Sequence, residues 1–380
     1  MNLFANVNCI LMLLPNFDQS MRQFYFTPGP SQLYFTVEEH IKSALKENIP
    51  SISHRSDSFK DIFRSTSLAL RQLLNLPQNY HILFTASATE VWERCIQNMV
   101  QFESCHFVNG AFSKRFASIS AHLGRKATSI EAPHGEVVDI KSVLIPESCE
   151  MIAMTQNETS TGAAHTLDDV NKIRKGFPDQ ILALDVVSCA PYVNIDYSMV
   201  DTAYFSVQKC FGLPAGLGVW IVNDRCINKS EGLLNAGLSV GSYHSLPELI
   251  LKAEKHQTPE TPNVLGIYLL GKVAEDMLNK GLEMIRRETD YKAAVLYNAI
   301  EQNPILQPFV KKSVNRSKTT LVAATTIDSN HIIEKLGEKS MIIGSGYGNY
   351  KKEHIRIANF PTHPKEHVEF IADELIKIRD

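Results

Sequence analysis

The sequence lacks the cysteine spacings that mark a disulfide framework or a zinc site. Its seven cysteines include no Cys-x-x-Cys pair, and none is paired with a histidine at a metal-ligand spacing. An odd number of scattered cysteines is typical of reduced, mostly buried thiols. We therefore expect a cytoplasmic protein that holds no metal ion.

An excess of charge of one sign is also missing. The formal net charge is -3 and 21% of the residues are charged, which gives no basic surplus to attract nucleic acid or anionic lipid. The apolar run from Cys9 to Leu14 is far shorter than the ~20 residues of a membrane-spanning helix, and no Lys or Arg precedes it. The composition predicts a protein that acts on small molecules, with neither a nucleic-acid nor a membrane partner.

The length predicts two domains. A chain of 380 residues exceeds the roughly 250 to 300 residues that one hydrophobic core supports. We expect a large domain over residues 31–284 and a small α+β domain that combines residues 21–30 with residues 285–380. Residues 1–20 are predicted to be an extension, either disordered or a mis-assigned start, because Met21 leads directly into a strand-like run.

Short β-branched and aromatic runs alternate with helical periodicity in the middle of the chain, which is typical of an α/β protein with a mostly parallel sheet. The predicted strands cover residues 80–85, 105–108, 127–131, 151–155, 181–185, 202–207 and 218–222. Helical spacing over 91–100 predicts that Trp92 and Cys95 pack in the core. Farther along, a long helix over 282–302, strands at 319–325 and 354–358 and a closing helix from about 364 are expected.

Three strand ends carry groups that suit one cofactor. Asp185 ends one apolar strand, Lys209 follows another, and a turn of small residues at 86–89 enters a helix directly. Each feature alone is commonly structural, as a cap, a solvated charge or a packing turn. Together they fit pyridoxal phosphate, which requires a lysine, a carboxylate at the ring nitrogen and a phosphate cradle. The backbone N–H groups of Ala88 and Thr89 would bind the phosphate at the helix start.

Motifs along nearly the whole chain beyond residue 20 resemble the phosphoserine aminotransferases of the class V group. They are Phe-Thr-Pro-Gly-Pro at 26–30, Ser-His-Arg-Ser at 53–56, Val-Asn-Gly-Ala-Phe-Ser at 108–113, Gln-Asn-Glu-Thr at 156–159, Gln-Lys at 208–209, Gln-Thr-Pro-Glu-Thr-Pro at 257–262 and His-Ile-Arg-Ile-Ala-Asn-Phe at 354–360. The resemblance implies the type I fold of pyridoxal-phosphate enzymes and a homodimer with shared active sites. It also implies amino transfer from L-glutamate to 3-phosphohydroxypyruvate, which gives phosphoserine and 2-oxoglutarate in serine biosynthesis.

The resemblance assigns the cofactor site residue by residue. Lys209 would bond the cofactor as a Schiff base, and Phe112 stands where the family usually stacks a tryptophan on the ring. Thr159 would bond the ring hydroxyl, and Gln257 with Thr258 would reach the phosphate of the neighbouring subunit. With the residues proposed from the strand ends, the predicted cofactor-binding set is Ala88, Thr89, Phe112, Thr159, Asp185, Gln208, Lys209, Gln257 and Thr258.

The substrate residues also come from the resemblance. Arg356 matches the arginine that clamps the α-carboxylate, and His54 with Arg55 matches the basic pair that meets the distal phosphate or γ-carboxylate across the dimer. The chain departs from the family at Thr89 and over residues 346–351, where cationic residues are usual. Two alternatives follow: an alanine- or serine-glyoxylate type of aminotransferase, and a non-catalytic binding protein on the same fold.

Overall fold

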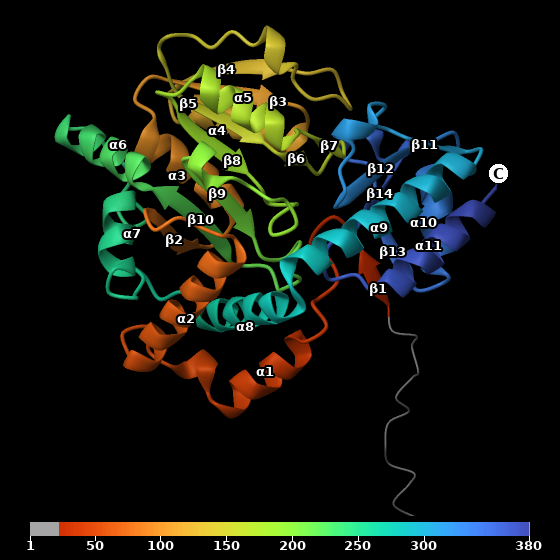
Figure 1. The fold of residues 1–380 in the computed structure, drawn as a ribbon, viewed down its shortest axis with the longest axis horizontal. Coiled ribbons are helices and arrows are strands. Elements are labelled where there is room, and N and C mark those ends of the chain that lie inside the picture. The colour runs from red at the N-terminus through yellow and green to blue at the C-terminus, as the bar shows by residue number, and fades with distance from the viewer. Residues whose placement is uncertain (1–22, 380) are drawn as a thin grey trace, which may run out of the picture.

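The computed structural model describes residues 23–379, so the predicted extension of residues 1–20 lies outside the described residues. The chain forms two separate sheets with helices packed around each, as Figure 1 shows. A two-stranded ribbon, β6 (Asn157–Glu158) and β7 (Ala163–Ala164), joins neither sheet. Within residues 23–379, no helix has the length and hydrophobicity required to cross a membrane.

The larger sheet has seven strands, and only β10 runs against the others. In spatial order they are β2 (Tyr80–Thr85), β10 (Gly218–Asn223), β9 (Thr202–Ser206), β8 (Ile181–Asp185), β5 (Cys149–Thr155), β3 (Glu103–Val108) and β4 (Lys126–Glu131). The prediction of a mostly parallel α/β sheet is confirmed. The predicted strand boundaries agree with these to within two residues.

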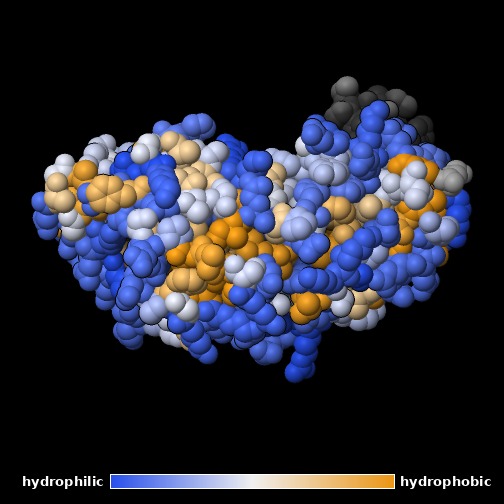
Figure 2. All heavy atoms as spheres, turned by 90° about the horizontal axis from the view of Figure 1, so that it is seen from above, coloured by the Kyte–Doolittle hydropathy of each residue, from blue (hydrophilic) through white to orange (hydrophobic). Residues whose placement is uncertain are grey.

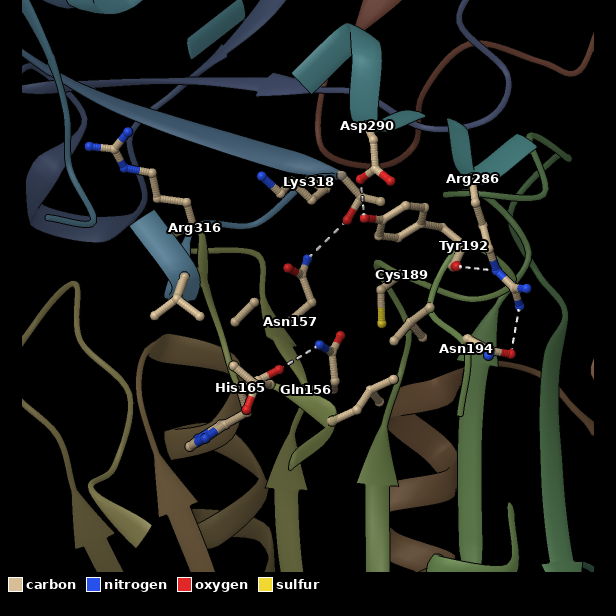
Figure 3. Close-up of a pocket in the computed structure, with 16 residues that line it drawn as sticks. Gln156, Asn157, His165, Cys189, Tyr192, Asn194, Arg286, Asp290, Arg316 and Lys318 are labelled. Atoms are coloured by element: carbon tan, nitrogen blue, oxygen red, sulfur yellow. Dashed lines mark hydrogen bonds between the residues drawn. The ribbon is translucent and has the colours of Figure 1, made fainter. Parts of the chain in front are cut away.

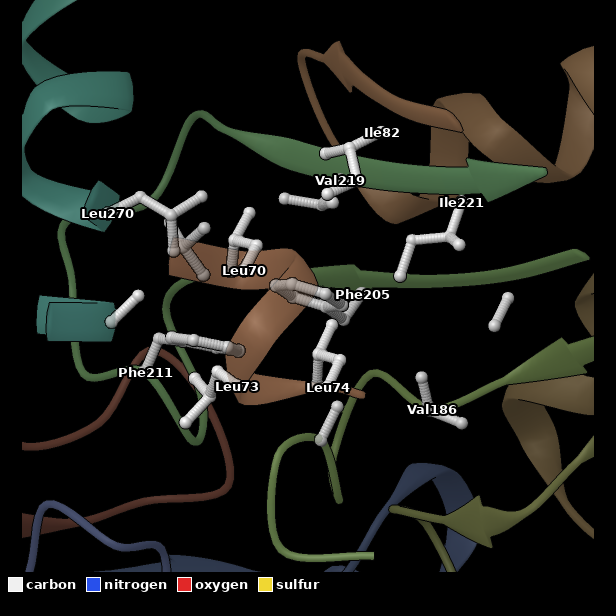
Figure 4. Close-up of a cluster of buried hydrophobic side chains, with 14 of the residues drawn as sticks. Leu70, Leu73, Leu74, Ile82, Val186, Phe205, Phe211, Val219, Ile221 and Leu270 are labelled. Atoms are coloured by element: carbon white, nitrogen blue, oxygen red, sulfur yellow. The ribbon is translucent and has the colours of Figure 1, made fainter. Parts of the chain in front are cut away.

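Helices cover both faces of this sheet, which explains why its central strands are apolar throughout. On one face, Leu70, Phe205 and Leu270 belong to a buried cluster that joins the sheet to α2 and α8, drawn in Figure 4. Another cluster, with Trp92 and Trp220, covers strands of the same sheet beside α3. The helices that accompany this sheet are α1 (Val37–Lys46), α2 (Asp57–Leu73), α3 (Ala88–Met99), α4 (Ala111–His122), α5 (Leu167–Gly176), α6 (Asp224–Asn235), α7 (Leu246–Ala253) and α8 (Val264–Lys280).

The smaller sheet joins the beginning of the described chain to its end. Strand β1 pairs with β13 in parallel, although more than 300 residues separate them in sequence. In spatial order the strands are β1 (Phe24–Phe26), β13 (Met341–Ser345), β14 (His354–Ala358), β12 (Thr320–Thr325) and β11 (Leu306–Pro308), and the helices are α9 (Leu282–Gln302), α10 (Ser329–Gly337) and α11 (Lys365–Lys377). The division of the chain into domains at residues 30/31 and 284/285 stays a prediction.

The strand register brings strand ends that carry polar and charged side chains to one edge of the larger sheet. Thr155 at the end of β5 is paired with Asp185 at the end of β8, and Asp185 in turn is paired with Tyr204 of β9. Strand β9 ends two residues later, and Lys209 follows it by three positions. Because the carboxyl ends of parallel strands share an edge, residues distant in sequence meet there.

Candidate active site

Asp185 and Lys209 line the same cavity at the carboxyl edge of the larger sheet. Both side chains are buried, with relative exposures of 4% and 7%. Ten further residues complete the wall: Ala88, Thr89, Trp92, Phe112, Thr155, Asn157, Thr159, Val187, Ser206 and Gln208. The structure therefore brings together seven of the nine residues predicted to bind the cofactor.

The Asp185 carboxylate is held by two donors. The backbone N–H of Val187 donates to Oδ1 at 3.0 Å, and the indole Nε1 of Trp92 donates to Oδ2 at 3.1 Å. Burial raises the pKa of Asp185 to about 6, although both hydrogen bonds and the nearby Lys209 act to lower it. The carboxylate is thus fixed in direction, and a cation next to it would restore its charged form.

Asparagine at position 185 is expected to remove the loss of stability that ionisation of Asp185 causes in the ligand-free protein as the pH rises. The pKa of Asp185 in the folded protein lies above its ordinary value, so protonation of this acid favours the folded state at low pH. This contribution to the free energy of unfolding is lost as the pH rises from about 4 through about 6. At about 1.36 kcal/mol per pKa unit, the gain in unfolding free energy has an upper limit of about 3 kcal/mol.

Urea unfolding of the wild-type chain and Asp185→Asn at about pH 4 and about pH 7.5 measures this gain. We expect the stability of Asp185→Asn relative to the wild type to rise between the two pH values. At both pH values the variant also loses one hydrogen bond, because the asparagine NH2 group cannot accept from Val187 or Trp92. Asp224→Asn, which changes an exposed acid 3.2 Å from His81 Nε2, is the matched control. Equal stabilities of the wild type and Asp185→Asn at both pH values would contradict the expectation.

Lys209 projects into the cavity with its amine directed at Thr159. Its Nζ donates to Thr159 Oγ1 at 3.0 Å and lies 5.4 Å from the centre of the Phe112 ring. Burial lowers the pKa of Lys209 to about 8, against the attraction of Asp185. A Cβ atom on Gly29 would lie 2.7 Å from Cγ of this lysine, so only glycine allows the chain to pass here. A buried amine with a lowered pKa is suited to nucleophilic attack and proton transfer.

The turn before α3 presents the start of a helix to the cavity. Ser87 caps the helix by accepting the N–H of Glu90 at 3.2 Å, and Glu90 Oε2 accepts the N–H of Ala86 at 2.8 Å. The N–H of Ala88 donates to the hydroxyl of Ser206 at 2.8 Å. A helix start beside hydroxyl groups is a suitable site for a phosphate.

Arg356, on β14 of the smaller sheet, does not line the cavity but contacts Thr159, which does. Its Nε donates to the carbonyl of Ser345 at 2.7 Å, and its Nη1 lies 3.5 Å from the carbonyl of Thr159. Its guanidinium lies 5.4 Å from the centre of the Tyr347 ring, and that ring lies 5.2 Å from the ring of Phe112. Thr159 therefore links Lys209, through its hydroxyl, to the guanidinium that is predicted to bind a carboxylate.

The other predicted residues lie elsewhere in the chain. His54, Arg55, Gln257 and Thr258 are not part of the wall around Lys209. Instead Arg55 donates to Gln257 Oε1 at 3.0 Å and to the carbonyl of Thr258 at 2.9 Å, which groups these residues in one place. Their predicted roles concern the active site of a partner subunit and stay predictions.

The prediction that Trp92 packs in the core is confirmed, and the side chain also faces the cavity. Its ring is buried, with an exposure of 3%, but its indole N–H holds the catalytic candidate Asp185 and its side chain lines the cavity. Ser206 and Asn157 were also missed as wall residues. A signal existed for Trp92: it lies one helical turn after Ala88, on the same face of α3 as the predicted phosphate turn.

A second cavity, of about 320 Å³, shares Asn157 with the first, whose volume is about 100 Å³. Figure 3 shows Asp290, Lys318 and Arg286 around this second cavity, with Gln156 and His165 on the opposite side. Arg286 is already engaged, because its guanidinium donates to the carbonyl of Tyr192 and to Asn194 at 3.0 Å each. Neither Lys209 nor Asp185 lines this larger cavity, so it does not fit the predicted chemistry.

Comparison with known proteins identifies the family. Residues 23–350 match the sequence profile described as aminotransferase class-V. The chain belongs to the class-V aminotransferase family. A solved phosphoserine aminotransferase from Cytophaga hutchinsonii is 46% identical to this class-V aminotransferase, with a TM-score of 0.92, and the match covers 93% of this chain and 98% of that one.

More distant class-V relatives extend the comparison. The phosphoserine aminotransferase of Rhodococcus opacus is 25% identical over 352 residues, which cover 90% of this chain and 91% of the relative. The alanine-glyoxylate aminotransferase structure from Nostoc sp. has a TM-score of 0.80 at 21% identity and covers 98% of this chain and 99% of that one, which shows a shared fold. The predictions of the enzyme class and of the type I fold are confirmed.

Proposed function

We propose that this class-V aminotransferase binds pyridoxal 5'-phosphate and transfers the amino group of L-glutamate to 3-phosphohydroxypyruvate, giving O-phospho-L-serine and 2-oxoglutarate in serine biosynthesis. The observation that carries the proposal is the buried pair Lys209 and Asp185, which face one cavity beside a helix start. The relatives named phosphoserine aminotransferase support the choice of substrate. A solved phosphoserine aminotransferase from Trichomonas vaginalis is described as bound to the cofactor.

The groups in the cavity fit this cofactor. Asp185 is a buried carboxylate whose pKa is raised by burial despite the nearby Lys209, and a protonated ring nitrogen would be a suitable cation to place next to it. Phe112 presents a ring face within reach of the lysine amine, and Gln208, Ser206 and the start of α3 supply polar contacts for a phosphate. The cavity therefore offers a carboxylate for the ring nitrogen and polar groups for the phosphate.

Different residues of the chain have different roles in the proposed amino transfer. Pyridoxal phosphate, when bound, supplies the electron sink for the charge that develops at the substrate Cα. Lys209 would hold the cofactor, and its free amine would take the proton from the substrate Cα. Its lowered pKa keeps more of the amine neutral near neutral pH. Arg356 would orient the substrate by binding the substrate's carboxylate. Its guanidinium lies close to Thr159, which also accepts a hydrogen bond from Lys209.

A homodimer with shared active sites completes the proposal. Arg55, Gln257 and Thr258 contact one another but do not line the cavity of their own chain, as residues that serve a partner's site would do. Large apolar side chains are exposed nearby in sequence, at Leu33, Phe35, Leu45 and Leu68. Figure 2 shows apolar side chains gathered near the middle of one face of the molecule. Six described cysteines, all free and buried, support a cytoplasmic location.

Arg55→Ala is expected to separate the phosphosubstrate from glyoxylate. We expect the rate of the half-reaction with 3-phosphohydroxypyruvate to fall about 100-fold, because a charge-assisted hydrogen bond to the distal phosphate is lost. The rate with glyoxylate, which has no distal group, should not change. Stopped-flow absorbance of the aminated enzyme, mixed with each oxo acid, measures both rates.

The matched control for Arg55 is Arg64→Ala, because Arg64 is an exposed arginine of α2 that pairs with Asp61 of the same helix at 3.1 Å. This change should leave both rates intact. A glyoxylate type of aminotransferase is the second candidate, favoured by the uncharged Thr89 and by the segment 346–351 where the resemblance leads one to expect a His-Arg pair. Fast turnover of glyoxylate with little response to phosphohydroxypyruvate would select that candidate.

A further inference from the structure

His244 lies between two carboxylates in the segment that joins α6 to α7. The residue is 1% exposed, its Nδ1 is hydrogen-bonded to Glu90 Oε1, and its Nε2 lies 2.9 Å from Glu260 Oε2. A carboxylate can only accept, so both ring nitrogens must donate, and the ring must carry a proton on each. His244 is therefore an imidazolium that bridges two acids.

The surroundings of His244 support this charge state. Burial lowers the pKa of His244, but the hydrogen bonds to Glu260 and Glu90 raise it to about 9 overall. Arg94, whose Nε lies 4.0 Å from Glu90 Oε1, is a further cation beside the bridge, His54 interacts with Glu260, and the Tyr243 ring stacks on the imidazole at 3.9 Å. The bridge is fully formed below the ordinary histidine pKa and is lost as the pH rises through about 9.

The two carboxylates that His244 bridges lie next to segments that, in the proposed function, bind a cofactor phosphate. Glu90 accepts the N–H of Ala86 at 2.8 Å with its second oxygen and so holds the turn that precedes α3. Glu260 follows Gln257 and Thr258, and its carbonyl accepts the hydroxyl of Thr258 at 2.8 Å. The imidazolium is thus the direct link between the turn at residues 86–89 and the segment at 257–260.

We propose that His244 is a positioning residue for the cofactor phosphate, because its bridge between Glu90 and Glu260 fixes the turn 86–89 relative to the segment 257–260. The proposal rests on the proposed function, in which the turn binds the chain's own cofactor and the segment serves the partner's. Without the imidazolium, two acids would face each other near a phosphate dianion. The bridge therefore couples retention of the anionic cofactor in the two sites of a dimer.

The test compares cofactor retention in the holoenzyme of the wild type and of His244→Gln across about pH 7 to 10. Pyridoxal phosphate released by ultrafiltration is quantified by its absorbance. At about pH 7.5 we expect the dissociation constant to rise roughly ten- to hundredfold in the variant, because a buried acid loses its cationic partner. The wild type should lose this advantage as the pH passes through about 9, whereas the variant should show no such step.

Two further variants distinguish positioning from general damage to the fold. Glu260→Gln keeps a hydrogen-bond acceptor but removes one of the two charges that raise the pKa of His244, so the wild-type step should move to lower pH. The double variant Glu90→Gln with His244→Gln removes the negative charge of Glu90 together with the positive charge of His244. It should regain part of the cofactor retention that His244→Gln alone loses. His81→Gln, which changes the histidine of a partly exposed pair with Asp224, is the matched control.

The outcomes are separable from those of the proposed function. A wild-type protein that binds no pyridoxal phosphate would overturn the proposed function itself. A His244→Gln protein that retains the cofactor as tightly as the wild type, with the same pH profile, overturns the role of His244 alone. An unmoved step in Glu260→Gln would do the same, even if His244→Gln failed to fold.

Discussion

Replacing Lys209 with alanine is expected to lower kcat by about 10⁴-fold or more, because one residue both holds the cofactor and transfers the proton. The absorbance band of the holoenzyme near 400 to 430 nm, an order-of-magnitude expectation, should vanish in this variant. Steady-state assays with L-glutamate and 3-phosphohydroxypyruvate, together with absorbance spectra, measure both effects.

The control for Lys209 is Lys318→Ala, which removes an exposed lysine at the neighbouring cavity. This variant should keep both the band and the rate. Undiminished turnover in Lys209→Ala would contradict the assignment of the buried amine. Loss of the band in both variants would instead point to general damage around the two cavities.

Replacing Arg356 with alanine is expected to lower kcat/KM by about 10² to 10³-fold for every amino donor and oxo acid. The guanidinium would contact the α-carboxylate that all substrates share, and removal of one partner of a buried ion pair costs about 3 to 5 kcal/mol. Arg356→Lys should restore activity only in part, because an ammonium cannot reproduce the planar fork that also donates to the Ser345 carbonyl at 2.7 Å. Initial rates over a range of substrate concentrations give the comparison.

The matched control for Arg356 is Arg316→Ala. Arg316 likewise donates to a backbone carbonyl, that of Val310 at 2.9 Å, but it lines the neighbouring cavity. Its removal should leave kcat/KM unchanged. A selective loss with phosphohydroxypyruvate in Arg356→Ala, and none with L-glutamate, would show that this arginine binds a distal group rather than the shared carboxylate.

Much of the fold could be predicted because the local sequence signals agree with the packing. Most strands from 80 to 223 are buried on both faces, so they appear in the sequence as largely apolar runs bounded by polar turns, whereas β4 at the edge of the sheet has no buried residue. The pairing of β1 with β13 was not predictable from periodicity. That contact joins the two ends of the described chain, and no local pattern encodes such a pairing.

The candidate site was predictable where its residues follow strand ends. Asp185 and Lys209 could be placed at one edge from strand order alone, because parallel strands share a carboxyl edge. Trp92 could not, since its ring packs like a core residue and only the direction of one N–H gives it a second role. The bridge through His244 joins the start of α3 to two loop segments distant from it in sequence, so it became visible only with side-chain geometry.

The most direct test of the central claim is to identify the lysine that bonds the cofactor. The protein is incubated with pyridoxal phosphate, the linkage is reduced with borohydride, and the modified peptide is sequenced by mass spectrometry. We expect the label on Lys209, opposite the buried carboxylate of Asp185. A label on another lysine, such as the buried Lys292 of α9, or no label at all, would contradict the claim.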